Sequence, residues 1–243
     1  MRESHFKESV LDLNFYRDWA AKRKAALEKK KDQRTFFVTV SREFGCEGYD
    51  IARKLTDKIS EQSETPWSLF THKIIEEMVA SESQETVEMV RKVSENRWTF
   101  KDWFVDALAP DYLQSESTHV FEGMRNVILN LADKGNCVIL GSGSQIITHW
   151  LDPKKFMGIH IRVIAAKSWR LNKVAHLFKA SREEAEKILK QKQDARARFI
   201  ADFTGLNSAD LSLYHMALNN ARVKPDAIAS LTTECLKLNG WEG

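Results

Sequence analysis

Cysteine is scarce in this sequence, and long apolar runs are absent. Cys46, Cys137 and Cys235 are the three cysteines among 243 residues, and no two of them form a C-x-x-C pair. This spacing argues against a disulfide framework and a zinc site, and it favours reduced thiols. No apolar run approaches the roughly 18 residues that span a bilayer, and the N-terminus has no apolar signal core. The sequence therefore predicts a cytoplasmic protein without a membrane partner.

Positive charges exceed negative charges only slightly. The chain has 37 Lys and Arg against 34 Asp and Glu, a net charge of +3, so composition demands no nucleic-acid surface. Among the seven histidines, His149, His160 and His176 show no ligand spacing to carboxylates, and we assign no metal ligand. At 43% apolar residues, the chain is long enough for a single large α/β domain or for a domain with a lid.

The most informative stretch is Thr35–Asp50, TFFVTVSREFGCEGYD. Its β-branched and aromatic start predicts a buried strand, and the apolar spacing from Ile51 onward predicts a helix. A strand, a loop and a helix in that order place backbone N–H groups and a positive helix end where phosphate binds. The common phosphate loop, G-x-x-x-x-G-K-[ST], is absent, because Tyr49 and Asp50 follow Gly48. The residues alone leave two interpretations open, a phosphate site and an ordinary glycine turn.

The rest of the chain alternates strands and helices. We expect strands at 65–71, 136–140, 156–165 and 216–219, and helices at 72–80, 118–135, 167–179, 182–203 and 225–238. This rhythm implies a mostly parallel sheet of about five strands with right-handed crossovers. We predict a domain at 35–243 after an N-terminal helical extension at 1–34.

Two segments suggest contacts with other molecules. The cationic helix at 21–31 is read as a solvated face or as a surface for an acidic partner or a second copy. The aromatic-rich segment, about 81–116, is read as core, as a subunit contact or as a platform that stacks on a base. A homo-oligomer, if it forms, is expected to use one of these two segments.

Several motifs resemble the cytidylate kinase-like family, a branch of the P-loop nucleoside monophosphate kinases. SREFGCEGYDIARKL (residues 41–55) is similar to its opening S-R-E-F-G-S-G-G-R-E-I-A motif, and CVILGSGS (137–144) resembles its V-I-V-G-R-G-A segment. The similarity continues to the helix at 181–188 and to Arg196, Phe199 and Gly205. The resemblance implies a P-loop kinase-like α/β fold with a helical lid at about 167–205. It also implies phosphate transfer from ATP, with Mg²⁺, to a nucleoside monophosphate or related small molecule.

The resemblance also implies the site residues. Catalytic cations would be Arg42, Arg170 and Arg196, because guanidinium groups bind phosphate bidentately and stay charged. The nucleotide phosphates would lie on Ser41, Gly45, Cys46, Gly48, Tyr49 and Asp50. The acceptor substrate would lie on Thr71, His72, Gly141, Ser142 and Gly143.

Departures from the family pattern support a second interpretation. Glu47 replaces a loop glycine and brings a negative charge to the phosphate position, where it could repel phosphate by several kcal/mol. Ser142 replaces an arginine, and Gln193 replaces the lid aspartate. We therefore keep two functions, with a nucleotide-binding kinase-like protein ahead of a catalytically silent binding or assembly module.

Overall fold

The computed structural model describes residues 34–82 and 117–243. The predicted N-terminal extension and the aromatic-rich segment lie outside the described residues, except at their edges. Within the described ranges, no helix is long and apolar enough to cross a membrane.

The described strands form one parallel sheet of five, in the order β2-β3-β1-β4-β5. Their bounds are β1 (Thr35–Arg42), β2 (Ser68–Thr71), β3 (Cys137–Leu140), β4 (Phe156–Ile164) and β5 (Met216–Asn219). The central strand β1 pairs with β3 through Val38↔Val138 and with β4 through Val38↔Ile159. The predicted parallel α/β fold is confirmed. The second strand is shorter than predicted and begins at Ser68, two residues after Pro66, which has no N–H to donate to a strand.

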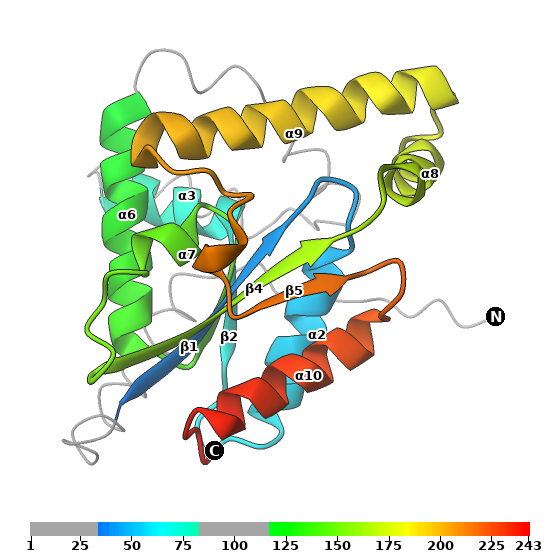
Figure 1. The fold of residues 1–243 in the computed structure, drawn as a ribbon. Helices are drawn as coiled ribbons and strands as arrows, with labels where there is room; N and C mark the ends of the chain where they lie inside the picture. Colours follow the sequence, from blue (N-terminus) through cyan, green and yellow to red (C-terminus); the bar gives the residue numbers. More distant parts are fainter. Residues whose placement is uncertain (1–33, 83–116) are drawn as a thin grey trace.

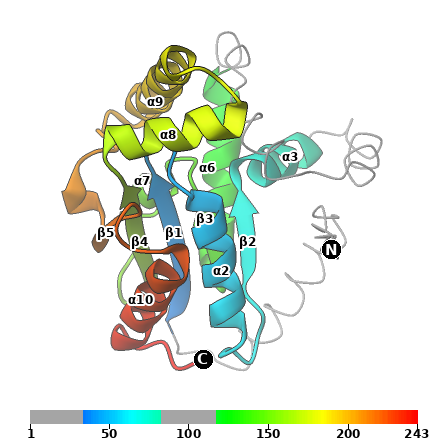
Figure 2. The same cartoon turned by 90° about the vertical axis from the view of Figure 1, so that its right-hand side faces the viewer.

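Helices cover both faces of the sheet (Figure 1). The described helices are α2 (Gly48–Ser60), α3 (His72–Glu82), α6 (Ser117–Lys134), α7 (Ser144–Ile147), α8 (Lys167–Phe178), α9 (Arg182–Thr204) and α10 (Pro225–Leu238), with a 3-10 turn, η2 (Leu211–Leu213). Figure 2 shows α2 and α10 side by side on one face, and α3, α6 and α7 lie on the other.

Each face has its own hydrophobic cluster because side chains alternate along a strand. Val38 and Val40 point toward α2 and α10, where they pack with Ile51 and Leu55. Phe37 points the other way and packs in a second cluster that α6 contributes to. The two buried layers fix the sheet and hold the loops at its carboxyl edge in place.

The lid, defined as α8 and α9, lies over that edge. In Figure 1, α9 runs across the top of the molecule from α8 to α6. A capping box at Ser181 and Glu184 begins α9, and Gly205 ends it with a left-handed φ of 67°. At its far end Phe203 stacks on Phe121 of α6, with ring centroids 4.7 Å apart. The C-terminal end of the lid is therefore anchored on α6.

Candidate functional site

The loop between β1 and α2 lies at the carboxyl edge of the sheet, beneath the lid. Its glycines are required by close contacts. Gly45 has a φ of 91°, and a Cβ there would lie 2.9 Å from Cβ of Arg170. A Cβ on Gly48 would lie 2.9 Å from Cγ of Arg42. Both positions therefore need glycine, because the backbone packs directly against arginine side chains.

Arg42 and Arg196 form a pair of cations beside this loop. Burial lowers the pKa of Arg42 well below its ordinary value, and the charge of Arg196 lowers it further. Burial likewise lowers the pKa of Arg196 to about 10. The Arg196 guanidinium lies over the Phe44 ring, 5.1 Å from its centroid. Lys192, one turn away on α9, also has a lowered pKa, caused by burial and then by Arg196. Burial thus opposes the charged form of all three groups, and the charge of Arg196 further lowers the pKa of Arg42 and of Lys192.

Arg170, predicted as catalytic, is bound to the loop itself. Its Nε donates to the carbonyl of Ala165 at 2.9 Å and lies 3.3 Å from the Glu43 carboxylate. Its Nη1 donates to the carbonyl of Phe44 at 3.1 Å. Glu43 in turn accepts from the N–H of Ala165 at 3.0 Å. The side chain therefore ties α8 to the β1–α2 loop.

Contacts at two loop residues, Phe44 and Glu47, close the loop from outside. Gln193 of α9 accepts a hydrogen bond from the Phe44 N–H at 2.9 Å. The Glu47 carboxylate accepts from Lys173 Nζ at 2.6 Å and from Asn220 Nδ2 at 3.2 Å. The Asn220 side-chain oxygen also accepts from the Glu47 N–H. The negative charge that the sequence places in the loop is therefore paired with Lys173.

A buried polar network behind the loop was missed by sequence reasoning. Arg162 on β4 is 5% exposed, and its Nη1 donates to Ser41 Oγ at 3.3 Å and to Tyr214 Oη at 3.2 Å. The same nitrogen donates to the carbonyl of Ser208, which lies just after the lid. Tyr214 Oη also accepts from Gln145 Nε2. Ser41, predicted to bind phosphate, is thus joined to this network. The signal available in the sequence was a lone arginine inside an apolar strand.

The predicted acceptor-side residues gather at the ends of β2 and β3. His72 Nδ1 lies 2.8 Å from Ser142 Oγ, and His72 Nε2 lies 3.1 Å from the Glu76 carboxylate. Gly141, Ser142 and Gly143 all have positive φ, of 83°, 57° and 68°. A Cβ on Gly141 would lie 2.1 Å from Nη1 of Arg42, so this turn touches the loop cation. The buried Thr71 precedes His72 at the end of β2.

Three other predicted residues have mainly packing or surface contacts. Asp50 pairs with Arg53 and Lys54 on α2. Tyr49 packs against the α2-side core. Cys46 is 5% exposed, and burial, followed by the charge of Glu43, raises the pKa of its thiol to about 12. The thiol is therefore uncharged at neutral pH.

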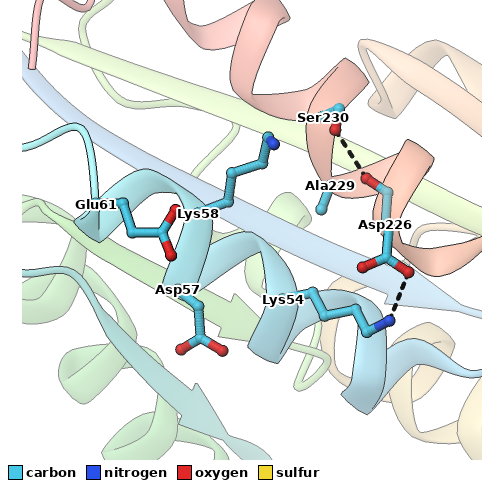
Figure 3. Close-up of a pocket in the computed structure, with 7 residues that line it drawn as sticks. All are labelled: Lys54, Asp57, Lys58, Glu61, Asp226, Ala229 and Ser230. Carbon is cyan, nitrogen blue, oxygen red and sulfur yellow. Dashed lines mark hydrogen bonds and ion pairs between the residues drawn. The ribbon is translucent and has the colours of Figure 1, made fainter.

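A shallow groove of about 240 Å³ lies between α2 and α10 (Figure 3). Its lining is mostly charged, and Lys54 donates to Asp226 at 2.6 Å across it. Figure 3 labels its seven residues, and none is among the predicted site residues. Its two lysines lie among three carboxylates, and we do not assign a ligand to it.

The parallel sheet, the glycine loop at its carboxyl edge and the arginine-bearing lid define a nucleotide-binding protein of kinase-like architecture. Comparison with family models agrees. The chain belongs to the cytidylate kinase-like family, whose model matches residues 37–222. No curated protein matches the sequence.

Solved structures of similar fold include an uncharacterized protein from Eubacterium ventriosum. It has a TM-score of 0.59 and 13% sequence identity, and the match covers 83% of this chain and 98% of that chain. Shikimate kinase from Bacteroides thetaiotaomicron is matched with a TM-score of 0.45 and 12% identity, over 84% of this chain and 98% of that chain. At such identities the first of these likenesses supports the fold alone.

Proposed function

We propose that the protein binds a nucleoside triphosphate at the β1–α2 loop and transfers its terminal phosphoryl group to a small-molecule acceptor. The observation that carries this proposal is the pair of partly buried cations, Arg42 and Arg196, beside the glycine loop. A polyphosphate would supply the opposite charge, and guanidinium groups bind phosphate oxygens with paired hydrogen bonds.

Phosphoryl transfer asks little covalent chemistry of the protein. It needs the reacting oxygens in line and the charge on the transferred group stabilised. Arg42 and Arg196 would stabilise that charge, since fixed cations in a site with little water act strongly on it. Arg170, which contacts Glu43, Ala165 and Phe44, would position the loop.

ATP with Mg²⁺ is the cofactor that this function implies, and the loop suits its phosphates. Gly45 and Gly48 let Arg170 and Arg42 pack directly on the loop backbone, which holds these two side chains beside the place where the phosphates would bind. Among the described residues, no group of three His, Cys, Asp or Glu side chains could hold a metal ion. Phosphate oxygens and water would therefore supply most of the Mg²⁺ ligands, as is common for this ion.

A catalytically silent binding or assembly module is the second candidate. Specific contacts favour it, because Gln193 already accepts the Phe44 N–H. Likewise, Lys173 and Asn220 hold Glu47 at the start of α2. In such a module the lid would serve only to keep the loop closed.

Calorimetry and thermal shift with ATP, GTP, CMP and AMP, each with and without Mg²⁺, test the proposal. A triphosphate at 100 times its Kd should stabilise the protein by about 2.7 kcal/mol. Arg42→Ala should lower turnover by about 10²–10³-fold, whereas Arg182→Ala, at an exposed position, should change it little. Absence of heat and of a shift with every nucleotide would overturn nucleotide binding. Binding without transfer to any acceptor would favour the silent module.

A further inference from the structure

We propose that the acceptor is a neutral hydroxyl compound, and that Ser142, His72 and Glu76 form the proton relay that activates its hydroxyl. This inference rests on the proposed phosphoryl transfer and names the class of its acceptor. It starts from a chain of three polar side chains at the edge of β2 and β3. Ser142 Oγ lies 2.8 Å from His72 Nδ1, and His72 Nε2 lies 3.1 Å from Glu76 Oε1.

The direction of these hydrogen bonds follows from the carboxylate. An ionised Glu76 can only accept, so in the neutral imidazole the proton lies on Nε2 of His72. Nδ1 then has a lone pair and accepts the hydroxyl proton of Ser142. The Ser142 oxygen is left with its lone pairs available to a second hydroxyl. A serine oriented in this way passes a proton to the histidine as it receives one.

The backbone at Ser142 is strained in a way that points to function. Ser142 has a φ of 57°, in the left-handed region that serine seldom adopts, between two glycines of positive φ. Such strain tends to persist at sites where a side chain must be aimed. Gly141, its neighbour, packs under the Arg42 guanidinium, and Gly143 packs under Ile200 of the lid. The relay therefore begins beside the cation that we assign to the triphosphate.

The lid also covers the histidine. The His72 ring meets Phe199 of α9 edge to face, with centroids 6.4 Å apart. The His72 side chain is 40% exposed. The lid therefore leaves room for a ligand on the exposed side of the histidine. The relay thus lies between the loop, the β3–α7 turn and the lid.

The local chemistry fits a hydroxyl better than a phosphate monoester. A phosphate monoester brings about two negative charges at neutral pH and needs cations to hold it. Arg42, the cation that touches this turn at Gly141, is assigned to the triphosphate. Thr71, His72 and residues 141–143 add no Lys or Arg of their own, and Glu76 adds a negative charge. The anionic oxygen of a phosphate needs no base, whereas an alcohol must lose its proton as the new O–P bond forms. Transfer to an alcohol therefore requires a base, which His72 would supply, and a carboxylate that stabilises the protonated base, which Glu76 would supply.

The acceptor oxygen attacks the terminal phosphorus of the triphosphate while the bridging P–O bond breaks, and the nucleoside diphosphate leaves with that electron pair. The acceptor proton moves to Ser142 Oγ, and the Ser142 proton moves to His72 Nδ1. The resulting imidazolium is stabilised by Glu76 at Nε2.

The test measures transfer of the labelled terminal phosphate of ATP, with Mg²⁺, to nucleosides, to their 5′-monophosphates, to glycerol and to water. His72→Gln keeps an oxygen that can accept from Ser142 but cannot take a proton. Ser142→Gly removes the hydroxyl and suits the positive φ. We expect label on a hydroxyl acceptor or in inorganic phosphate, and about 10²-fold lower kcat in both variants. KM for ATP should stay within about twofold, because only the transition state uses the relay. His176→Gln, at an exposed position on α8, serves as the matched control and should match the wild type.

Transfer to the monophosphates at a rate that His72→Gln leaves unchanged would overturn the inference. Label recovered on Ser142 by mass spectrometry would do so too, since the serine would then be the terminal acceptor. ATP binding is measured by calorimetry on the same samples to separate the two proposals. No binding would refute the proposed function itself, whereas binding without transfer to any acceptor would refute the relay and leave nucleotide binding in place.

Discussion

Replacing Arg196 by methionine should stabilise the protein without ligand and weaken its binding of ATP. Burial lowers the pKa of Arg196 from 12.5 to about 10, which corresponds to roughly 3 kcal/mol against the charged form. Because the side chain is only partly buried, solvent screening reduces this penalty to about 1–2 kcal/mol. The contact with the Phe44 ring returns about 0.5–1 kcal/mol. Methionine, which is apolar and flexible, keeps the packing on Phe44 without the charge.

The sign of the effect on stability follows because the pKa of Arg196 lies above 7 in both the folded and the unfolded chain. At pH 7 the guanidinium is charged in the folded and in the unfolded chain, so the penalty is fully present. It is relieved only as the pH rises above about 10, the pKa in the folded state. The net gain of Arg196→Met at pH 7 is therefore about 0–1.5 kcal/mol, or a rise in Tm of up to about 6 °C.

Urea denaturation without nucleotide and calorimetry with ATP and Mg²⁺ measure the two halves of this prediction. Loss of one charged hydrogen bond to phosphate should weaken ATP binding by about 10–100-fold, or roughly 1.5–3 kcal/mol. Arg182→Met is the matched control, because Arg182 is exposed at the start of the same helix. A variant at position 196 that is less stable and binds ATP as tightly as the wild type would refute the reasoning, since Arg196 would then be a structural residue.

Three further variants test neighbouring contacts. Glu47→Gly should tighten ATP binding measured by calorimetry, because it removes a carboxylate and releases the Lys173 ammonium; equal or weaker affinity would show that Glu47 does not oppose phosphate. Gln193→Ala should lower stability in urea by about 1–2 kcal/mol, since the Phe44 N–H loses its acceptor, and ATP affinity should not fall; a large loss of affinity would contradict this. The pKa of His160 is lowered from 6.5 to about 3, first by burial, so stability should be full above about pH 6.5 and fall by up to about 1.4 kcal/mol per pH unit toward pH 3. His160→Gln should flatten that fall in urea titrations at pH 7 and pH 5, and an unchanged slope would assign the fall to other groups.

The sequence predicted most of the fold because local patterns determine it. The strand at Met216–Asn219 and the helix at Pro225–Leu238 have the bounds that their composition and the early proline indicate. The start of β2 was wrong by three residues, since Thr65 and Pro66 precede the paired segment. Periodicity identifies elements well, but pairing with a neighbouring strand decides where each one begins.

The site was harder to predict because its contacts join distant positions. The role of Arg170 depends on Glu43 and Phe44, which lie more than 120 residues earlier in the chain. By contrast, His72 and Glu76 are four residues apart on one helix, and this spacing was available to sequence reasoning. Sequence reasoning placed His72 on the acceptor side but did not join it to Glu76.

The free energies of the contacts around the loop favour nucleotide binding over the silent module. The contacts that close the loop are weak: the Gln193 hydrogen bond contributes about 1 kcal/mol net, and the half-exposed Lys173–Glu47 pair contributes about 0–1 kcal/mol. A ligand of micromolar affinity supplies about 8 kcal/mol, so it could displace both contacts. Burial lowers the pKa of Arg42 and of Arg196, because the charged form of each loses solvation in the folded protein. An anionic ligand would offset that loss, which closure of the loop alone does not require.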